Sequence, residues 1–147
     1  MKATSLVLLM VLTIAVTGCG QSPLPEPSVT RPDVKPVHLT DTNFQAEVLE
    51  SEVPVLVDMW VPWCQPCIAM KPTLRQIASE LTGKVKVSEL NIEENPFTKQ
   101  KYDVDRYPML LVFLDGKEVE RLVGLKSKEE LNEVMRVYTR DQTGAAQ

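Results

Sequence analysis

Residues 57–67 read VDMWVPWCQPC, and this stretch decides the expected fold. It includes most of a nearly continuous apolar run, residues 55–60, with the length and composition of a strand that is covered on both faces. Two cysteines follow, Cys64 and Cys67, and then come apolar residues at helical spacing before Gly83: Leu74, Ile77, Ala78 and Leu81. The cysteines are therefore expected where a buried strand gives way to the start of a helix.

The position of the two cysteines predicts their chemistry. Unpaired N–H groups and the helix dipole stabilise negative charge at a helix N-terminus, so a cysteine there ionises below its reference pKa of about 8.5. Cys64, at the exposed edge, is expected to attack a disulfide, and Cys67, one turn inward, to resolve the mixed disulfide. Two alternatives remain. One is a zinc site, which would need four ligands, although apart from Cys19 the chain offers only these two cysteines and the distant His38. The other is a structural disulfide, which would add little stability across so short a loop.

The rest of the chain from residue 37 alternates between strand and helix patterns. Asp115-Gly116 is a strong hairpin signal, and Ser127 with Glu130 forms a capping box before a last helix. The resulting order βαβαβαββα predicts an α/β sandwich of helices around a mixed sheet. The expected elements between residue 37 and this last helix are a first strand, a helix through Phe44 and Val48, strand 55–60, the helix after Cys64, strand 85–92, a helix or turn at 95–102, and strands 109–114 and 118–123.

Residues 1–18 have the pattern of a secretory signal, with Lys2, an apolar run and small residues at the end. The run is too short for a lasting transmembrane helix, which needs about 20 apolar residues. It ends in Val16-Thr17-Gly18-Cys19, which resembles the lipobox of bacterial lipoproteins, where cleavage precedes a lipid-bearing cysteine. Lipidation of Cys19 is therefore expected; the alternative is ordinary cleavage nearby, which would leave a free thiol.

Residues 19–36 are expected to form a lipidated tether. The segment from residue 20 reads GQSPLPEPSVTRPDVKP, with five of the eleven prolines and no aromatic side chain, which favours an extended chain. We expect a single domain over residues 37–141 and a flexible tail at 142–147. The formal net charge of −4, with acidic residues spread along the sequence, disfavours nucleic acid as a partner.

The expected domain resembles thioredoxin over essentially its whole length. VDMWVPWCQPC is similar to the active-site stretch of that family, with Gln65 where thioredoxins usually have glycine. Tyr107-Pro108 resembles the family's cis-proline site, Asp115-Gly116 its hairpin turn, and Gly124 a glycine beside the substrate groove. The resemblance implies the thioredoxin fold, a central mixed sheet flanked by helices, and thiol–disulfide exchange without an organic cofactor or a metal.

The resemblance also implies roles for individual residues. Asp58 lies inside the apolar strand, where burial should raise its pKa, and the resemblance makes it the proton acceptor and donor for Cys67. Its alternative is a hydrogen-bonded structural aspartate. Trp60 resembles the tryptophan that packs beneath the site and influences its pKa values, or is simply a core aromatic. Substrate contacts are implied for a set of residues along the rim of the site: Trp63, Pro66, Tyr107, Pro108 and Gly124. The alternative for Pro108 is a proline that starts a strand.

Glu89 departs from the family pattern, because thioredoxins generally carry a lysine there. Period-two counting places it on the strand face of Val85 and Val87, so it is expected to lean towards Asp58. Two neighbouring carboxylates resist ionising together, which predicts a raised apparent pKa for the acids and an altered redox poise. The alternative is a solvated surface glutamate.

The expected function is thiol–disulfide exchange at Cys64 and Cys67 on disulfides or dithiols of cell-envelope proteins. The enzyme is expected on a bacterial envelope membrane, facing the periplasm, with a membrane electron-transfer partner that the sequence does not identify. Two rivals remain: a thioredoxin-fold binding module without catalysis, and a maturation reductase for cytochromes or metal centres. The latter often carries an inserted element, and the sequence has no spare segment for one.

Overall fold

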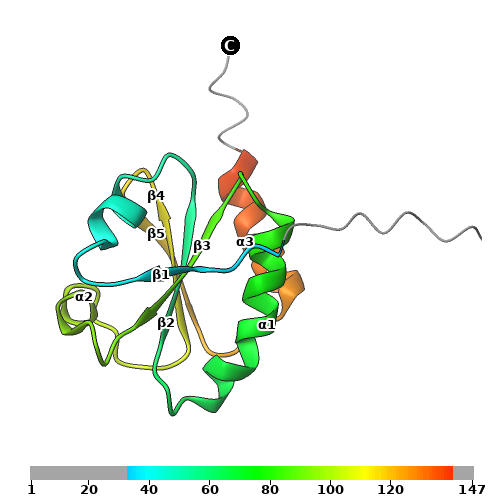
Figure 1. Cartoon of the computed structure of the whole chain (residues 1–147). Helices are drawn as coiled ribbons and strands as arrows, with labels where there is room; N and C mark the ends of the chain where they lie inside the picture. Colours follow the sequence, from blue (N-terminus) through cyan, green and yellow to red (C-terminus); the bar gives the residue numbers. More distant parts are fainter. Residues whose placement is uncertain (1–32, 141–147) are drawn as a thin grey trace, which may run out of the picture. The chain divides into compact units, whose positions relative to one another are not determined.

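The computed structural model describes residues 33–140, so the expected signal at 1–18, Cys19, most of the tether and the tail at 142–147 lie outside the described residues. The elements follow the expected order βαβαβαββα (Figure 1). They are β1 Val37–Leu39, η1 Gln45–Leu49, β2 Val55–Trp60, α1 Gln65–Glu80, β3 Lys86–Asn91, α2 Pro96–Lys101, β4 Met109–Leu114, β5 Lys117–Val123 and α3 Lys128–Arg140.

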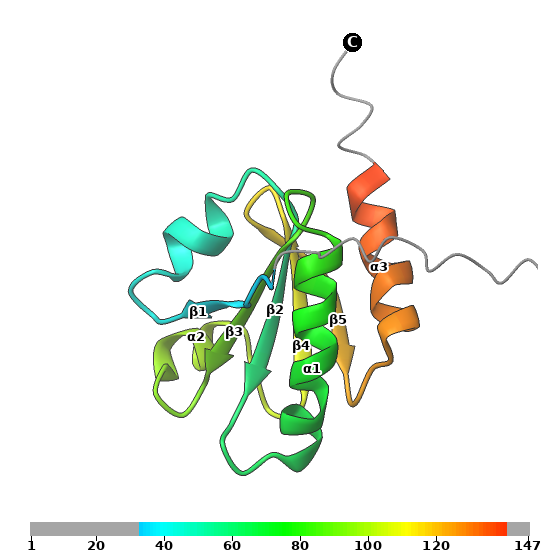
Figure 2. The same cartoon turned by 45° about the vertical axis from the view of Figure 1, so that its right-hand side comes forward.

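The strands form one five-stranded sheet in the order β1-β3-β2-β4-β5. β3 is parallel to β1 and to β2, whereas β4 is antiparallel to both β2 and β5, so the expected mixed sheet is confirmed. Helices α1 and α3 cover one face of the sheet, and η1 and α2 lie on the other side (Figures 1 and 2). This arrangement is an α/β thioredoxin fold.

Burial on both faces explains why β2 and β4 are so apolar. Each has five consecutive buried residues and only its last residue partly exposed. One core cluster lies under η1 and includes Phe44, Val57 and Phe113; the other lies under α1 and α3 and includes Leu56 and Leu74. Truncation of any of these large side chains to alanine would cost about 2–5 kcal/mol.

The hairpin between β4 and β5 forms where expected. Asp115 and Gly116 both have positive φ, at 50° and 74°, which suits a tight two-residue turn between antiparallel strands. A Cβ on Gly116 would lie 2.6 Å from the carbonyl oxygen of Leu49, so the turn also packs closely against the end of η1. Glycine is needed at this position for both reasons.

Two local features differ from the expectations. The short helix near Phe44 and Val48 is π-helical over Gln45–Leu49, and residue periodicity could not have shown this. Contacts of the domain also begin earlier than residue 37, because Val34 packs on the α1 side of the core and its amide donates to Ser79 Oγ at 3.2 Å. Among residues 33–140, no helix is both long and apolar enough to cross a membrane.

Candidate active site

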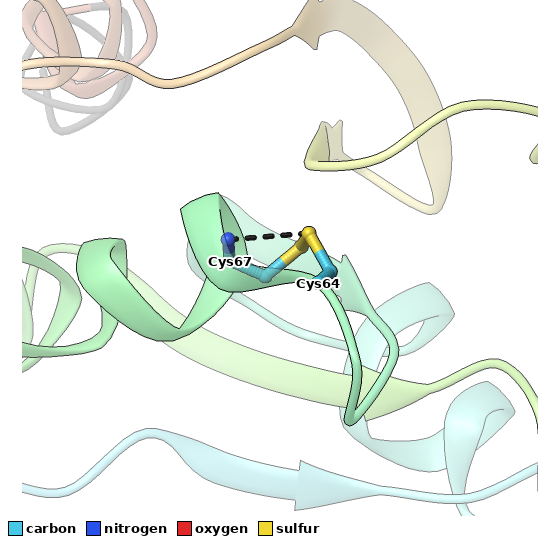
Figure 3. Close-up of a disulfide and its surroundings, with 2 residues drawn as sticks. All are labelled: Cys64 and Cys67. Carbon is cyan, nitrogen blue, oxygen red and sulfur yellow. Dashed lines mark hydrogen bonds between the residues drawn. A yellow bond between two sulfur atoms is a disulfide. The ribbon is translucent and has the colours of Figure 1, made fainter.

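Cys64 and Cys67 lie at the N-terminus of α1 (Figure 3). A short link of residues 61–64 joins the end of β2 to the helix, and Cys64 is the N-cap residue with an extended backbone. The amide of Cys67 donates a hydrogen bond to Cys64 Sγ at 3.2 Å, so the sulfur takes the place of a capping oxygen. Pro66 occupies the first turn, where a backbone donor is not needed.

The two cysteines are joined by a disulfide, with their Cα atoms 5.3 Å apart. Cys64 keeps 5% of its surface exposed and Cys67 keeps none. Cys64 is thus the more exposed of the two cysteines. Within the described part of the chain, no three His, Cys, Asp or Glu side chains are grouped in a way that could hold a metal ion.

Asp58 is fully buried in β2, and neither of its carboxylate oxygens has a hydrogen-bond partner among the described residues. Burial raises the pKa of Asp58 to about 7; the positive charge of Lys71 opposes the rise, and the negative charge of Glu89 adds to it. No described residue supplies the hydrogen bond that the alternative of a structural aspartate calls for. A buried acid that titrates near neutral pH can take up or release a proton during a reaction.

Glu89 lies directly beside Asp58 in the parallel pair β2–β3, on the same side of the sheet, as period-two counting predicted. Its carboxylate pairs with Lys71 Nζ at 2.8 Å, and both side chains are about three-quarters buried. A fully solvated surface glutamate is therefore wrong for Glu89. Lys71 was not predicted as a site residue, although it is four residues after Cys67 and so lies on the same face of α1.

Trp60 ends β2 and is half-buried against the core cluster under η1. The ammonium of Lys71 lies 3.7 Å from the centre of its ring, within range of a cation–π interaction. The indole N–H is buried without a hydrogen-bond partner in the described part of the chain. Trp60 therefore contacts Lys71, whose positive charge opposes the rise in the pKa of Asp58.

The rim contains the aromatic and proline residues that the sequence singled out. Trp63 is 63% exposed, its ring meets Tyr107 edge to face at 5.5 Å, and its indole N–H donates to Glu93 at 2.6 Å. Glu93 was not predicted. The Tyr107–Pro108 bond is cis, as the resemblance implied, and the Pro108 carbonyl accepts a hydrogen bond from the Gly124 amide at 2.9 Å.

A disulfide at a helix N-terminus, with its first cysteine the more exposed and a buried acid on the preceding strand, is the arrangement of a thiol–disulfide oxidoreductase. The comparisons with known proteins agree with this class. The family model named Thioredoxin matches residues 35–137, and the chain belongs to the thioredoxin family.

The chain is similar to thioredoxins from several bacteria. It is 43% identical to the thioredoxin of Rickettsia felis over 94 residues, which cover 64% of this chain and 90% of that relative. It is 41% identical to thioredoxin 1 of Nostoc sp. over 97 residues, 66% of this chain and 91% of the relative. The match to the thioredoxin of Synechocystis sp. is 41% over 100 residues, 68% and 94% of the two chains.

Proposed function

We propose that this oxidoreductase reduces disulfides in proteins of the bacterial cell envelope while a lipid on Cys19 holds it at a membrane. The observation that best supports the redox chemistry is the hydrogen bond from the Cys67 amide to Cys64 Sγ at the N-terminus of α1. In the reduced enzyme the same amide and the helix dipole stabilise a Cys64 thiolate.

The reaction transfers two electrons from the enzyme dithiol to a substrate disulfide. The Cys64 thiolate attacks one substrate sulfur, a mixed disulfide forms, and the other substrate sulfur leaves as a thiolate that takes up a proton. Cys67 then attacks the Cys64 sulfur, which breaks the mixed disulfide and releases the second substrate thiolate. The substrate is reduced to a dithiol and the Cys64–Cys67 disulfide is formed.

Asp58 acts in this scheme as the acid and base for Cys67. Cys67 is fully buried, and a buried thiol does not ionise readily without a nearby base. Because the pKa of Asp58 is about 7, its carboxylate accepts the Cys67 proton near neutral pH and returns a proton in the reverse reaction.

The rim of the site binds an extended segment of the substrate. Trp63 presents a large exposed ring that Tyr107 and Glu93 hold in place. Pro66 is exposed, Gly124 is partly exposed and Pro108 is buried, and these three residues are proposed to contribute backbone contacts to the substrate. A rigid aromatic of this kind contributes contact area at low entropic cost.

The membrane tether rests on the sequence of residues 1–36. The apolar run that ends in Gly18-Cys19 supports signal cleavage and lipidation, and the proline-rich residues 20–36 would extend up to about 50 Å at roughly 3.1 Å per residue. For turnover in an oxidising compartment, a membrane electron-transfer partner with a dithiol must reduce the Cys64–Cys67 disulfide again.

A redox titration against glutathione tests the direction of electron flow. We expect a potential altered from the thioredoxin value of about −270 mV but closer to it than to about −120 mV, which favours reduction of substrates. A potential near about −120 mV would make the enzyme an oxidant and contradict the proposal. Insulin reduction, with Cys64→Ser as the inactive control, separates an enzyme from a scaffold that only binds its partners.

The tether has its own test in cells. The full chain, expressed in a Gram-negative host with radiolabelled palmitate, should incorporate label and sediment with membranes, whereas Cys19→Ala should do neither. A labelled Cys19→Ala variant, or an unlabelled parent in the soluble fraction, would refute the lipid anchor without affecting the redox chemistry.

A further inference from the structure

Helix α3 buries one apolar face in the core and leaves a second, mixed face beside β5 (Figure 2). Leu131 and Met135 are fully buried, whereas Val137 keeps 58% of its surface exposed. The second face begins at Glu130 and continues at i+3, i+4, i+7 and i+8, which is the spacing of one side of a helix. Its residues are Glu130, Glu133, Val134, Val137 and Tyr138.

A pocket of about 310 Å³ lies between this face and β5, and we call it the β5–α3 pocket. Its apolar lining comes from Leu122 on β5 and from Val134, Val137 and Tyr138 on α3. The volume is at the lower end of the range of about 300–1,000 Å³ found for ligand sites. The pocket is therefore of a size to receive individual side chains of a partner.

The rim of the β5–α3 pocket is acidic. Among its lining residues the carboxylates are those of Glu120, Glu130 and Glu133, and the one ammonium is that of Lys126. Lys126 Nζ lies 3.9 Å from Glu130 Oε1, so these two charges offset each other. Glu120 accepts a hydrogen bond from the neutral Tyr138 hydroxyl at 3.3 Å, and Glu133 has no ion-pair partner in the part of the chain that the structure describes. Two negative charges thus remain uncompensated beside an apolar lining.

The β5–α3 pocket is close in sequence to the rim of the active site. The amide of Gly124 donates to the Pro108 carbonyl at 2.9 Å. The exposed Leu125 follows, and then comes Lys126, which lines the pocket. Because two residues of extended chain span at most about 7 Å, a protein bound at Gly124 has only a short distance to cover to reach the pocket.

We propose that the β5–α3 pocket docks a segment of the partner protein in which an apolar side chain lies between lysines or arginines, while the partner's disulfide reacts at Cys64. The apolar side chain packs against the lining of the pocket, and the basic side chains pair with Glu120 and Glu133. This inference rests on the proposed disulfide exchange and adds to it a second contact outside the redox site.

The charges favour this occupant over two others. In a symmetric dimer of this chain the same patch would face itself, so that Glu120 and Glu133 would meet the same carboxylates of the second copy. A surface of anionic lipids would be repelled in the same way. A basic and apolar protein segment complements both the lining and the rim.

Fluorescence anisotropy with the oxidised full chain measures the docking directly. The probe is a labelled peptide with leucines between lysines, and its counterpart carries glutamates in place of the lysines. We expect the lysine peptide to bind, more weakly as the salt concentration rises, and the glutamate peptide not to bind. Glu133→Lys should weaken binding about tenfold, and Val137→Ser, which removes an exposed apolar side chain, about threefold.

Two exposed residues outside the lining provide matched controls. Glu52→Lys makes the same change in net charge as Glu133→Lys but lies in the loop before β2. Val119→Ser removes a valine from β5 in the same way as Val137→Ser does from α3. Neither control should change the affinity by more than about twofold.

The role in exchange has a separate readout. When the lysine–leucine segment is joined by a flexible linker to a small disulfide loop, the KM for reduction of the loop should fall while kcat stays the same, and Glu133→Lys should remove this gain. Absence of binding, or equal weakening by Glu133→Lys and Glu52→Lys, would overturn the docking site. Binding without an effect on KM would overturn its role in exchange. Reduction of the loop alone, with Cys64→Ser as the inactive control, tests the proposed function independently.

Discussion

Asp41 and Asp58 show how differently one fold treats the same side chain. The carboxylate of Asp41 accepts hydrogen bonds from the Phe97 amide at 3.1 Å, the Thr98 amide at 2.8 Å and Thr98 Oγ1 at 2.6 Å. Although partial burial alone would raise its pKa, these bonds hold the pKa of Asp41 below its ordinary value. Asp58 is fully buried, none of the residues that the structure describes donates a hydrogen bond to it, and its pKa rises to about 7.

The difference separates a structural acid from a chemical one. Asp41 caps the first turn of α2 from outside the helix, because the side chain of the N-cap residue Asn95 makes no capping bond. Asp58 gains nothing for stability from its charge and is costly to ionise. A group that is costly in the fold and titrates near the working pH is one that a reaction can use.

The largest expected effect comes from Asp58→Asn. Between its ordinary pKa of 3.8 and its folded value of about 7, the folded state keeps a proton that the unfolded state has released. Stability therefore falls as pH rises through this window and stays lower above it. The variant cannot ionise, so it should be more stable than the parent by about 2–4 kcal/mol at pH 8.5 and by much less at pH 5.

Urea unfolding of the oxidised protein at the two pH values measures this gain. Asp115→Asn is the control, because Asp115 is exposed at the hairpin turn and asparagine tolerates its positive φ. An equal change at pH 5 and pH 8.5 for Asp58→Asn would show that Asp58 is not held protonated by the fold.

Asp41→Ala should change the free energy of unfolding in the opposite direction from Asp58→Asn. It leaves two α2 amides and the Thr98 hydroxyl without their acceptor and should cost about 1–3 kcal/mol at pH 7. Because the folded pKa is depressed, this stabilisation is present above the ordinary pKa of 3.8 and is lost as pH falls through the lower folded value. Urea unfolding at pH 7 and pH 3 checks it; the same loss at both would contradict the role of the ionised carboxylate.

The smallest expected change in stability comes from removing either of two buried hydroxyl groups. Thr98 Oγ1 donates to Asp41, so Thr98→Val should cost about 1 kcal/mol. Ser88 Oγ is buried in β3 and has no hydrogen-bond partner among residues 33–140, so Ser88→Ala should leave stability unchanged or raise it by up to about 1 kcal/mol. The thermal unfolding midpoints of the two variants measure these effects. A larger loss of stability for Ser88→Ala than for Thr98→Val would show that Ser88 has a hydrogen-bond partner.

The sequence predicted the fold where local patterns decide it. Strands 55–60 and 109–114 were predicted to the residue, because each is a nearly continuous apolar run that directly follows a proline. The capping box of α3 was also confirmed: the Ser127 amide donates to Glu130 at 2.8 Å and the Glu130 amide to Ser127 Oγ at 3.2 Å. These features depend only on neighbours in the chain.

What the sequence missed depends on contacts between separate elements. The position of Glu89 on its strand was predicted, but its ion pair with Lys71 joins β3 to α1 and has no local signature. The same is true of the hydrogen bond from Trp63 to Glu93, thirty residues apart. Periodicity gives the face on which a side chain lies, but the reach of a long polar side chain depends on the packing of the elements.

The claim on which the mechanism depends is that the N-terminus of α1 stabilises the thiolate of Cys64 near neutral pH. The most direct measurement is the rate of iodoacetamide alkylation from pH 5 to pH 10 in two variants that also carry Cys19→Ala. The first, with Cys67→Ala, leaves Cys64, and the second, with Cys64→Ala, leaves Cys67. We predict that Cys64 reacts with an inflection well below the reference value of about 8.5 and that Cys67 is nearly inert at pH 7. Equal rates for the two thiols, with inflections at or above about 8.5, would contradict the assignment of Cys64 as the nucleophile.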